Sequence, residues 1–445
     1  MAPNHVLRNL LAESGWTGQT LANHTNELGA EMGLRLRYDR TGVAHWLSGT
    51  RPRPPVPELV AEAFTRRLGR RVTAADTGLE RAASVAPPPG WHTGVAAELV
   101  NLCEDGAASR RTVAGCVYSL AALSVPGWAD LAGVAATARP ADGAGKLERA
   151  ELDAAKAMLE LFSAADLMFG GGHARPALVR YLQTTVAPWL RSDAAPAVRT
   201  ELFVTAAQLC YLCGFLCFDD ESHGAAQRYY LVAARLSRAA GDAVQYAITL
   251  RALSVQARML GHRTPAVNLA TAAARALPGH APARARAFLT GQVAVAEAAT
   301  ADHRRAVAHL RAAETYLGQA SDVAVPVGSY HSAALSHHHA AVRACLGERR
   351  AAVSALTRSL RHRSATERRA RAITLARLAE LHLDTGELDR ACQSWNEFLD
   401  DYPHLCSRRA DTALATLRAR LRPHAGYSAA RAVAYKAAEL CRAAA

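Results

Sequence analysis

Three cysteines lie close together in one apolar segment, where cysteine side chains can either hold a metal ion or pack in a core. Cys210, Cys213 and Cys217 follow an i, i+3, i+7 spacing, which places their thiols on one face of a helix. Thiolates are preferred ligands of zinc, but no pair of His or Cys residues at zinc-site spacing accompanies them. We therefore expect the three cysteines to serve as small buried hydrophobic residues, and we expect no metal and no cofactor.

Two other groups of residues have suitable chemistry but unsuitable spacing. His337, His338 and His339 are adjacent, so on a helix their side chains point about 100° apart and cannot all bind one ion. The segment Gly170–His173 resembles a phosphate-binding loop, but no Lys with Ser or Thr follows it, so we expect a tight break between helices. Because paired catalytic acids, a serine elbow and a nucleotide fingerprint are also missing, we expect no enzymatic activity.

The segment Asp39–Arg53, which reads DRTGVAHWLSGTRPR, carries the most informative polar side chains. Asp39 can cap the N-terminus of a short helix, and Gly49 can end that helix. The apolar residues of this helix would pack inward: Val43, Trp46 and Leu47. Three polar side chains would then face outward: Arg40, Thr41 and His45.

This segment resembles the recognition helix and the following turn of helix-turn-helix regulators of the XRE type. The resemblance implies that the polar face of the helix enters the major groove of DNA. Arg can donate two hydrogen bonds to guanine, and Thr can contact a base or a phosphate. Arg40 and Thr41 are therefore the best candidates for reading bases, with His45 as a third.

Further residues of the same region are candidates for phosphate contacts. Arg51 and Arg53 flank prolines, where a rigid turn could hold them against the DNA backbone without reading sequence. Gln19 resembles the Gln that often bonds a phosphate near the start of the second helix. The alternative is a four-helix cap that has lost DNA binding: residues 1–71 hold ten arginines against six acidic residues, and the insertion Ala30–Tyr38 is longer than usual in this class.

Three segments rich in Pro or Gly interrupt the helical pattern: Arg51–Pro57, Ala86–Gly90 and Ala138–Gly145. Such clusters do not continue a helix, so they separate structural units. We expect four short helices in residues 1–80, which is the size of a helix-turn-helix domain. Residues 91–195 are expected to form a helical bridging segment, with helices over Leu147–Phe169 and Ala177–Leu190.

Residues 199–445 show a repeating pattern of helix pairs that resembles tetratricopeptide repeats. The pattern is clearest in Ile373–Leu399, where Gly386 falls at the turn and Ala391 at the small position of the second helix. We expect about six pairs, at an irregular spacing of roughly 39 to 47 residues. Each pair leaves one face unburied, so the pairs must stack into a curved α-solenoid with a concave groove.

The composition agrees with an all-α protein. The 445 residues are 50% hydrophobic, 20% charged and 6% aromatic, and few segments show the alternation that strands require. The formal net charge of +13 is compatible with a polyanionic partner. We found no export signal and no membrane-spanning stretch, and we expect a cytoplasmic protein with reduced thiols.

The order of these parts resembles bacterial, especially actinobacterial, regulators that join an XRE-type domain to tetratricopeptide repeats, and Met158–Leu182 looks like a block found in them. The resemblance implies a transcriptional regulator that binds DNA. Its repeats would bind an effector, which is a peptide, a protein or a small molecule, or would form a homodimer.

In that family the first helix of each pair lines the groove, which makes Arg251, Arg258 and His337 the candidate effector-binding residues. Basic side chains on an inner wall suit a carboxylate, which Arg can bind through two hydrogen bonds. Two alternatives stay open. One is an adaptor that binds a partner protein through its repeats without direct DNA binding, and the other is a ligand sensor that acts through a partner transcription factor.

Overall fold

The computed structural model describes residues 3–32, 34–79, 94–107, 117–123, 125–129, 146–320 and 330–443. Within these residues the protein is almost entirely helical, which confirms the all-α class. Two strands of two residues each, β1 (Lys146–Leu147) and β2 (Asp193–Ala194), pair in parallel and form the small sheet of the described chain. The sequence did not predict this sheet.

The N-terminal unit, which we call the head, consists of four helices: α1 (His5–Ser14), α2 (Gly18–Glu31), α3 (Arg40–Leu47) and α4 (Val56–Leu68). The side chains of Thr17 and Asp39 accept hydrogen bonds from the first turns of α2 and α3, as the sequence predicts. Val43 and Trp46 of α3 are buried with Phe64 of α4 in one apolar core. The predicted four-helix arrangement is therefore present, with the fourth helix beginning one residue before Pro57.

A bridge of helices follows the head: α5 (Val95–Ala107), α6 (Arg149–Phe169), α7 (Gly171–Tyr181), the π-helix Leu182–Val186 and α8 (Ala187–Trp189). The expected tight break between helices over Gly170–His173 is present but shorter than expected, because α6 ends at Phe169 and α7 already begins at Gly171. The interruption is Gly170 alone, whose φ of +87° favours glycine. A Cβ atom at Gly171 would lie 2.6 Å from the carbonyl oxygen of Leu216, so this glycine lets α7 pack closely on the helix that carries Leu216.

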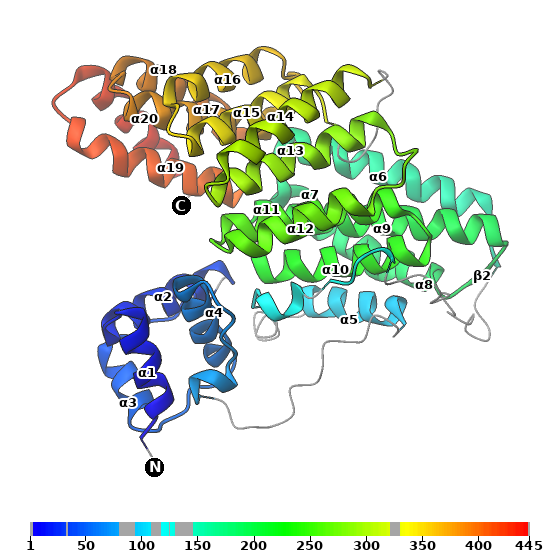
Figure 1. Cartoon of the computed structure of the whole chain (residues 1–445), viewed down its shortest axis with the longest axis horizontal. Coiled ribbons are helices and arrows are strands. Elements are labelled where there is room, and N and C mark those ends of the chain that lie inside the picture. Colours follow the sequence, from blue (N-terminus) through cyan, green and yellow to red (C-terminus); the bar gives the residue numbers. More distant parts are fainter. Residues whose placement is uncertain are drawn as a thin grey trace.

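Residues 196–320 and 330–443 form a stack of helix pairs, which we call the array (Figure 1). Its helices are α9 (Pro196–Asp219), α10 (His223–Ala239), α11 (Ala243–Met259), α12 (Arg263–Ala276), α13 (Ala283–Ala299), α14 (His303–Gly318), α15 (Ser332–Cys345), α16 (Arg349–Arg361), α17 (Arg368–Asp384), α18 (Leu388–Asp401), α19 (Arg408–Leu421) and α20 (Ser428–Ala443). Each odd-numbered helix packs against the next helix in the chain, and neighbouring pairs pack against each other. The described part of the array therefore has six pairs and a solenoid-like arrangement.

The turn inside a pair repeats one backbone feature. In five of the pairs, one turn residue has a positive φ: Glu221, Gly261, Ala301, Gly347 and Gly386. The repeat therefore requires a left-handed residue at the end of its first helix, and glycine meets this requirement at three of the five positions.

The bridge is bonded to both ends of the array. Asp166 of α6 accepts a hydrogen bond of 2.9 Å from the guanidinium of Arg369 in α17, and Asp219 of α9 lies 3.8 Å from the same guanidinium. Near the start of α19, the backbone of Cys406 donates to the carbonyl of Phe169 and accepts from the amide of Gly172. These contacts join α6 and α7 to the second half of the array, so the array is closed on one side by the bridge.

Helix α9 is long and apolar enough to cross a membrane, but 78% of its most apolar window is buried inside the protein. It packs against α10, α7 and α6. The hydrophobicity of α9 is therefore explained by its burial between α10 and the bridge helices.

The turn residues predict opposite effects of two small substitutions. A left-handed backbone costs an L-residue about 1 kcal/mol, so Ala301→Gly should stabilise the protein by about 0.5 to 1 kcal/mol. Gly261→Ala should destabilise it by about 1 kcal/mol, because a Cβ there meets no atom within 4 Å and only the backbone opposes it. Urea unfolding followed by circular dichroism measures both changes. A loss of stability in Ala301→Gly would contradict the account of these turns.

Candidate functional site

The outer face of α3 carries the polar residues that the sequence singled out. Arg40, Thr41 and His45 are exposed, while Val43 and Trp46 on the opposite face are buried. Figure 1 shows α3 on the side of the head that is turned away from the array. The three side chains are therefore accessible from solvent along one short helix.

The surface around α3 is strongly basic. Residues 32–57 contain five arginines and one acid, Asp39, and Asp39 is engaged as the cap of α3. The five arginines are exposed: Arg35, Arg37, Arg40, Arg51 and Arg53. None of them forms an ion pair with a carboxylate in the part of the chain that the structure describes. Their charge is thus available to a polyanion.

Side chains of α2 hold α3 in place. Gln19 accepts a hydrogen bond of 3.1 Å from the backbone amide of Arg40, so its oxygen is engaged at the start of α3. Asn26 bonds both the amide and the carbonyl of Tyr38, and the Tyr38 ring packs edge-on against Trp46 at 4.9 Å. Sequence reasoning missed Asn26 and Tyr38, because a contact across the segment between α2 and α3 leaves no periodic signal.

The opposite side of the head contacts the array. Glu62 of α4 lies 2.9 Å from Nε2 of His262, the residue after the α11 turn glycine, and both side chains are almost fully buried. Tyr118 stacks on the His262 ring at 5.5 Å. Arg66 donates to Glu62 and, through two nitrogens, to Glu31. Separating the head from the array would leave the buried Glu62 carboxylate without His262, and an incompletely paired buried charge has a high free energy. This network therefore holds the head on the array.

A cavity of about 310 Å³ lies inside the array, and we call it the inner pocket. Helices that are first in their pairs supply most of its wall, and α6 of the bridge supplies most of the rest. Its polar and charged lining residues are Ser163, Asp166, Tyr211, Arg251, His331, His337, His338, Arg363, Glu367, Arg369, Thr374 and Arg409.

Two of the three predicted effector-binding residues line the inner pocket. Arg251 of α11 and His337 of α15 face it, whereas Arg258 lies farther along α11 and outside its lining. Burial lowers the pKa of Arg258, and Arg251 and Arg409 are among the charges that lower it further. Arg258 thus belongs to the same basic inner wall but not to this cavity.

Sequence reasoning missed Arg363, Arg369 and Arg409, which come from the second half of the array. Their helices are distant from α11 in sequence, and arginine is frequent throughout the chain, so neither spacing nor composition distinguishes them. The relevant signal is that Arg369 and Arg409 each occupy the second position of the first helix of a pair, whereas Arg363 lies between α16 and α17.

The charges of the pocket are only partly compensated. Arg369 is paired with Asp166, and Arg363 with Glu367 at 2.6 Å. Arg251 and Arg409 have no ion pair with a described carboxylate. Burial is the main cause that lowers the pKa of each of these two guanidiniums. The pocket therefore holds an excess of positive charge in a poorly hydrated place.

Burial lowers the pKa of two histidines of the inner pocket, His337 and His338, which favours their neutral forms near pH 7. Burial, together with nearby arginines, lowers the pKa of His337 to about 4. Its Nδ1 is buried without a hydrogen-bond partner in the described chain. His338 has its pKa lowered for the same reasons, and its Nδ1 lies 2.9 Å from the hydroxyl of Tyr330.

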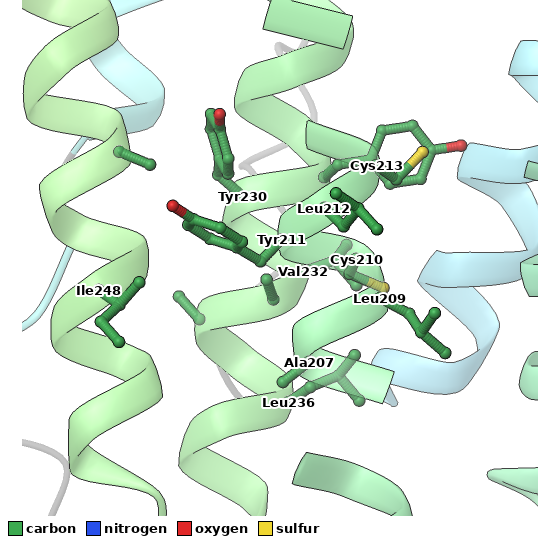
Figure 2. Close-up of a cluster of buried hydrophobic side chains, with 14 of the residues drawn as sticks. Ala207, Leu209, Cys210, Tyr211, Leu212, Cys213, Tyr230, Val232, Leu236 and Ile248 are labelled. Carbon is green, nitrogen blue, oxygen red and sulfur yellow. The ribbon is translucent and has the colours of Figure 1, made fainter. Parts of the chain in front are cut away.

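The three cysteines of α9 are buried in the core of the first helix pairs. Figure 2 shows the side chains of Cys210 and Cys213 pointing away from Ile248 of α11, while Tyr211 points toward that side. Burial raises the pKa of Cys210 and Cys213 well above the ordinary value, which disfavours the thiolate that metals require. Within the described residues, no group of three His, Cys, Asp or Glu side chains has the geometry of a metal site.

Comparison with known proteins adds one finding for the head. Residues 7–80 match the family model of the SP15 N-terminal domain. The match covers α2, α3, α4 and all but the first two residues of α1, and it does not extend to the bridge or the array. No curated protein matches the sequence. The SP15-like head is thus the part of the chain that a known family describes.

The neutral state of His337 predicts an acid-dependent loss of stability. Its folded-state pKa of about 4 lies below the ordinary value of about 6.5, so its contribution is present above pH 6.5 and is lost as the pH falls toward 4. Between pH 7 and pH 5 this histidine should reduce the unfolding free energy by about 2 kcal/mol. His337→Asn should remove that part of the pH dependence, as measured by urea unfolding at both pH values. The exposed His280 provides the control, and an unchanged pH dependence in His337→Asn would contradict the assignment.

Proposed function

We propose that the protein is a DNA-binding transcriptional regulator of the cytoplasm, whose SP15-like head reads DNA through α3 and whose tetratricopeptide-like array binds an effector in the inner pocket. The observation that carries the proposal is the exposed polar face of α3, surrounded by arginines without carboxylate partners. A short helix with this arrangement fits the major groove, where side chains meet base edges.

The arrangement of α2 and α3 supports a helix-turn-helix role for the head. Gln19 and Asn26 of α2 bond the chain at and just before the start of α3, so the orientation of α3 is fixed before DNA is bound. Arg40 and Thr41 lie in the first turn of α3, which is the part of a recognition helix that reaches base edges. Arg51 and Arg53 lie beyond its end, in a position to contact phosphates.

The contact between the head and the array gives a route for regulation. His262 lies in the turn between α11 and α12, and α11 also carries Arg251 in the inner pocket. A change in curvature on effector binding would move this turn relative to Glu62 and thereby reposition α3. In a homodimer, the same change would alter the spacing of two heads and their match to two half-sites.

A second function, that of an adaptor that binds a partner protein without touching DNA, is favoured by one observation. The chain between α2 and α3 runs from residue 32 to residue 39, which is longer than the three or four residues usual in a helix-turn-helix. The adaptor would use the array for binding and the head as a cap. DNA binding by the purified protein separates the two functions.

Electrophoretic retardation of a fragment from the protein's own promoter region tests the DNA-binding proposal. Arg40→Ala should weaken specific binding by about 1 to 3 kcal/mol and leave nonspecific binding almost unchanged, because Arg40 would contact bases. Arg53→Ala should weaken binding to all sequences similarly. It should also reduce the slope of the logarithm of the binding constant against the logarithm of the salt concentration by about 1, because one phosphate contact is lost.

Arg304→Ala provides the control for these variants, because Arg304 is an exposed arginine of α14 in the array and far from the head. It should bind DNA as the unmodified protein does. Equal, sequence-independent losses from Arg40→Ala and Arg53→Ala would remove Arg40 from base reading. Absence of any salt-sensitive retardation would favour the adaptor.

A further inference from the structure

We propose that the inner pocket binds a small organic anion with an aromatic body, and that Arg251 and Arg409 hold its anionic group. As the identity of an effector, this inference rests on the proposed function. The binding itself is a property of the array, so it can be tested without DNA.

The size of the inner pocket limits the ligand to a small molecule. Its volume of about 310 Å³ lies at the lower end of the range for small-molecule sites, which is about 300 to 1,000 Å³. A folded peptide helix would need a longer groove. The bridge helix α6 also covers one side through Asp166, which closes the cavity further.

The positive charge of the pocket favours a negatively charged ligand. Of its four arginines, Arg363 and Arg369 are neutralised by Glu367 and Asp166, so these acids do not repel an anion. Arg251 and Arg409 form no such ion pair in the described chain. Asp219 and Glu221 are near enough to oppose the lowering of the Arg409 pKa by burial, so the charge of Arg409 is partly compensated. No carboxylate is among the causes that act on the pKa of Arg251. Burying an incompletely compensated charge is very unfavourable. A ligand carboxylate or phosphate would supply the missing negative charge and is therefore the ligand group that the pocket stabilises most.

Arg251 is held in position to receive that group. Its guanidinium lies over the ring of Phe288 at 4.1 Å from the ring centroid, and the hydroxyl of Tyr211 is near enough to oppose the lowering of its pKa by burial. Its Nε is buried and has no hydrogen-bond partner in the described chain. Because one face of the guanidinium already packs on a ring and its Nε still has a hydrogen bond to donate, the side chain loses little conformational freedom when it binds an oxyanion.

The remaining wall fits an aromatic body. Phe215 and Phe288 contribute rings to the lining, and Leu212 and Ile373 contribute aliphatic surface. His337 also lines the pocket, and its unpaired Nδ1 can make a hydrogen bond with a polar atom of the ligand. Apolar walls with a few convergent polar groups are typical of small-molecule sites.

Three probes test this inference: 2-naphthoate, its neutral analogue 2-naphthamide, and inorganic phosphate, each added to the full-length protein at constant ionic strength without DNA. Saturation-transfer NMR and the thermal unfolding midpoint report binding. We expect 2-naphthoate to bind and to raise the midpoint, 2-naphthamide to bind at least about tenfold more weakly, and phosphate to compete with 2-naphthoate.

Two variants locate the binding. Arg251→Met and Arg409→Met should each weaken 2-naphthoate binding at least about tenfold, whereas Arg304→Met on the outer surface should not change it. Circular dichroism checks that each variant is folded, and Arg251→Lys, which keeps the charge, should retain part of the affinity.

Several results would overturn the inference. Failure of 2-naphthoate to bind at millimolar concentration would do so, and so would equal binding of the amide or unchanged binding in both Arg→Met variants. Binding of phosphate without 2-naphthoate would exclude the aromatic body and identify a phosphoryl ligand. Because no DNA is present, a failure here leaves the DNA-binding proposal intact, and the reverse also holds.

Discussion

The ion-pair network of Arg369 is the interaction on which the arrangement of the bridge, the array and the inner pocket depends. Its guanidinium bonds Asp166 of α6, lies 3.8 Å from Asp219 of α9, and packs over Phe215 at 4.7 Å. All three charged side chains are buried, so each requires the others for compensation. A stack of helix pairs contacts only its neighbours along the chain, but this network joins the first pair to the fifth through the bridge. The closed side of the inner pocket is a consequence of that connection.

Local signals in the sequence were sufficient for most of the helices and their order, but the single helix expected over Ala177–Leu190 is divided between α7, the π-helix Leu182–Val186 and α8. Caps such as Thr17 and Asp39, and the small residues of the repeats, act within a few positions and follow helix geometry directly. At Gly170–His173 the three consecutive glycines indicated a break between helices, but not that the break is confined to Gly170 and that α7 begins at Gly171. There the requirement for glycine comes from close contacts with Leu216 and Cys406, which are distant in sequence. A single sequence carries no information on such contacts.

The candidate sites divide in the same way. The outward positions of Arg40, Thr41 and His45 followed from one helical turn, and the structure places all three on the surface. The repeat register was enough to predict Arg251 and His337 as residues of the groove. It did not indicate Arg409, because the pocket and its excess of positive charge form only where helices from several pairs converge. Whether an arginine has a carboxylate partner is a property of the folded chain, and within the pocket lining it distinguishes Arg251 and Arg409 from Arg363 and Arg369.

The head and the inner pocket are separate sites connected by a small buried contact between Glu62 and His262. Coupling between them requires two arrangements of that contact with different affinities for DNA or effector. The central claim is that the protein recognises specific DNA through α3. Capture of genomic fragments by the full-length protein, followed by sequencing, tests it most directly. The account predicts enrichment of fragments that share a short motif, and loss of that enrichment when Arg40 and Thr41 are both replaced by alanine. Captured fragments with no common motif, or a motif that is retained in the double variant, would contradict it.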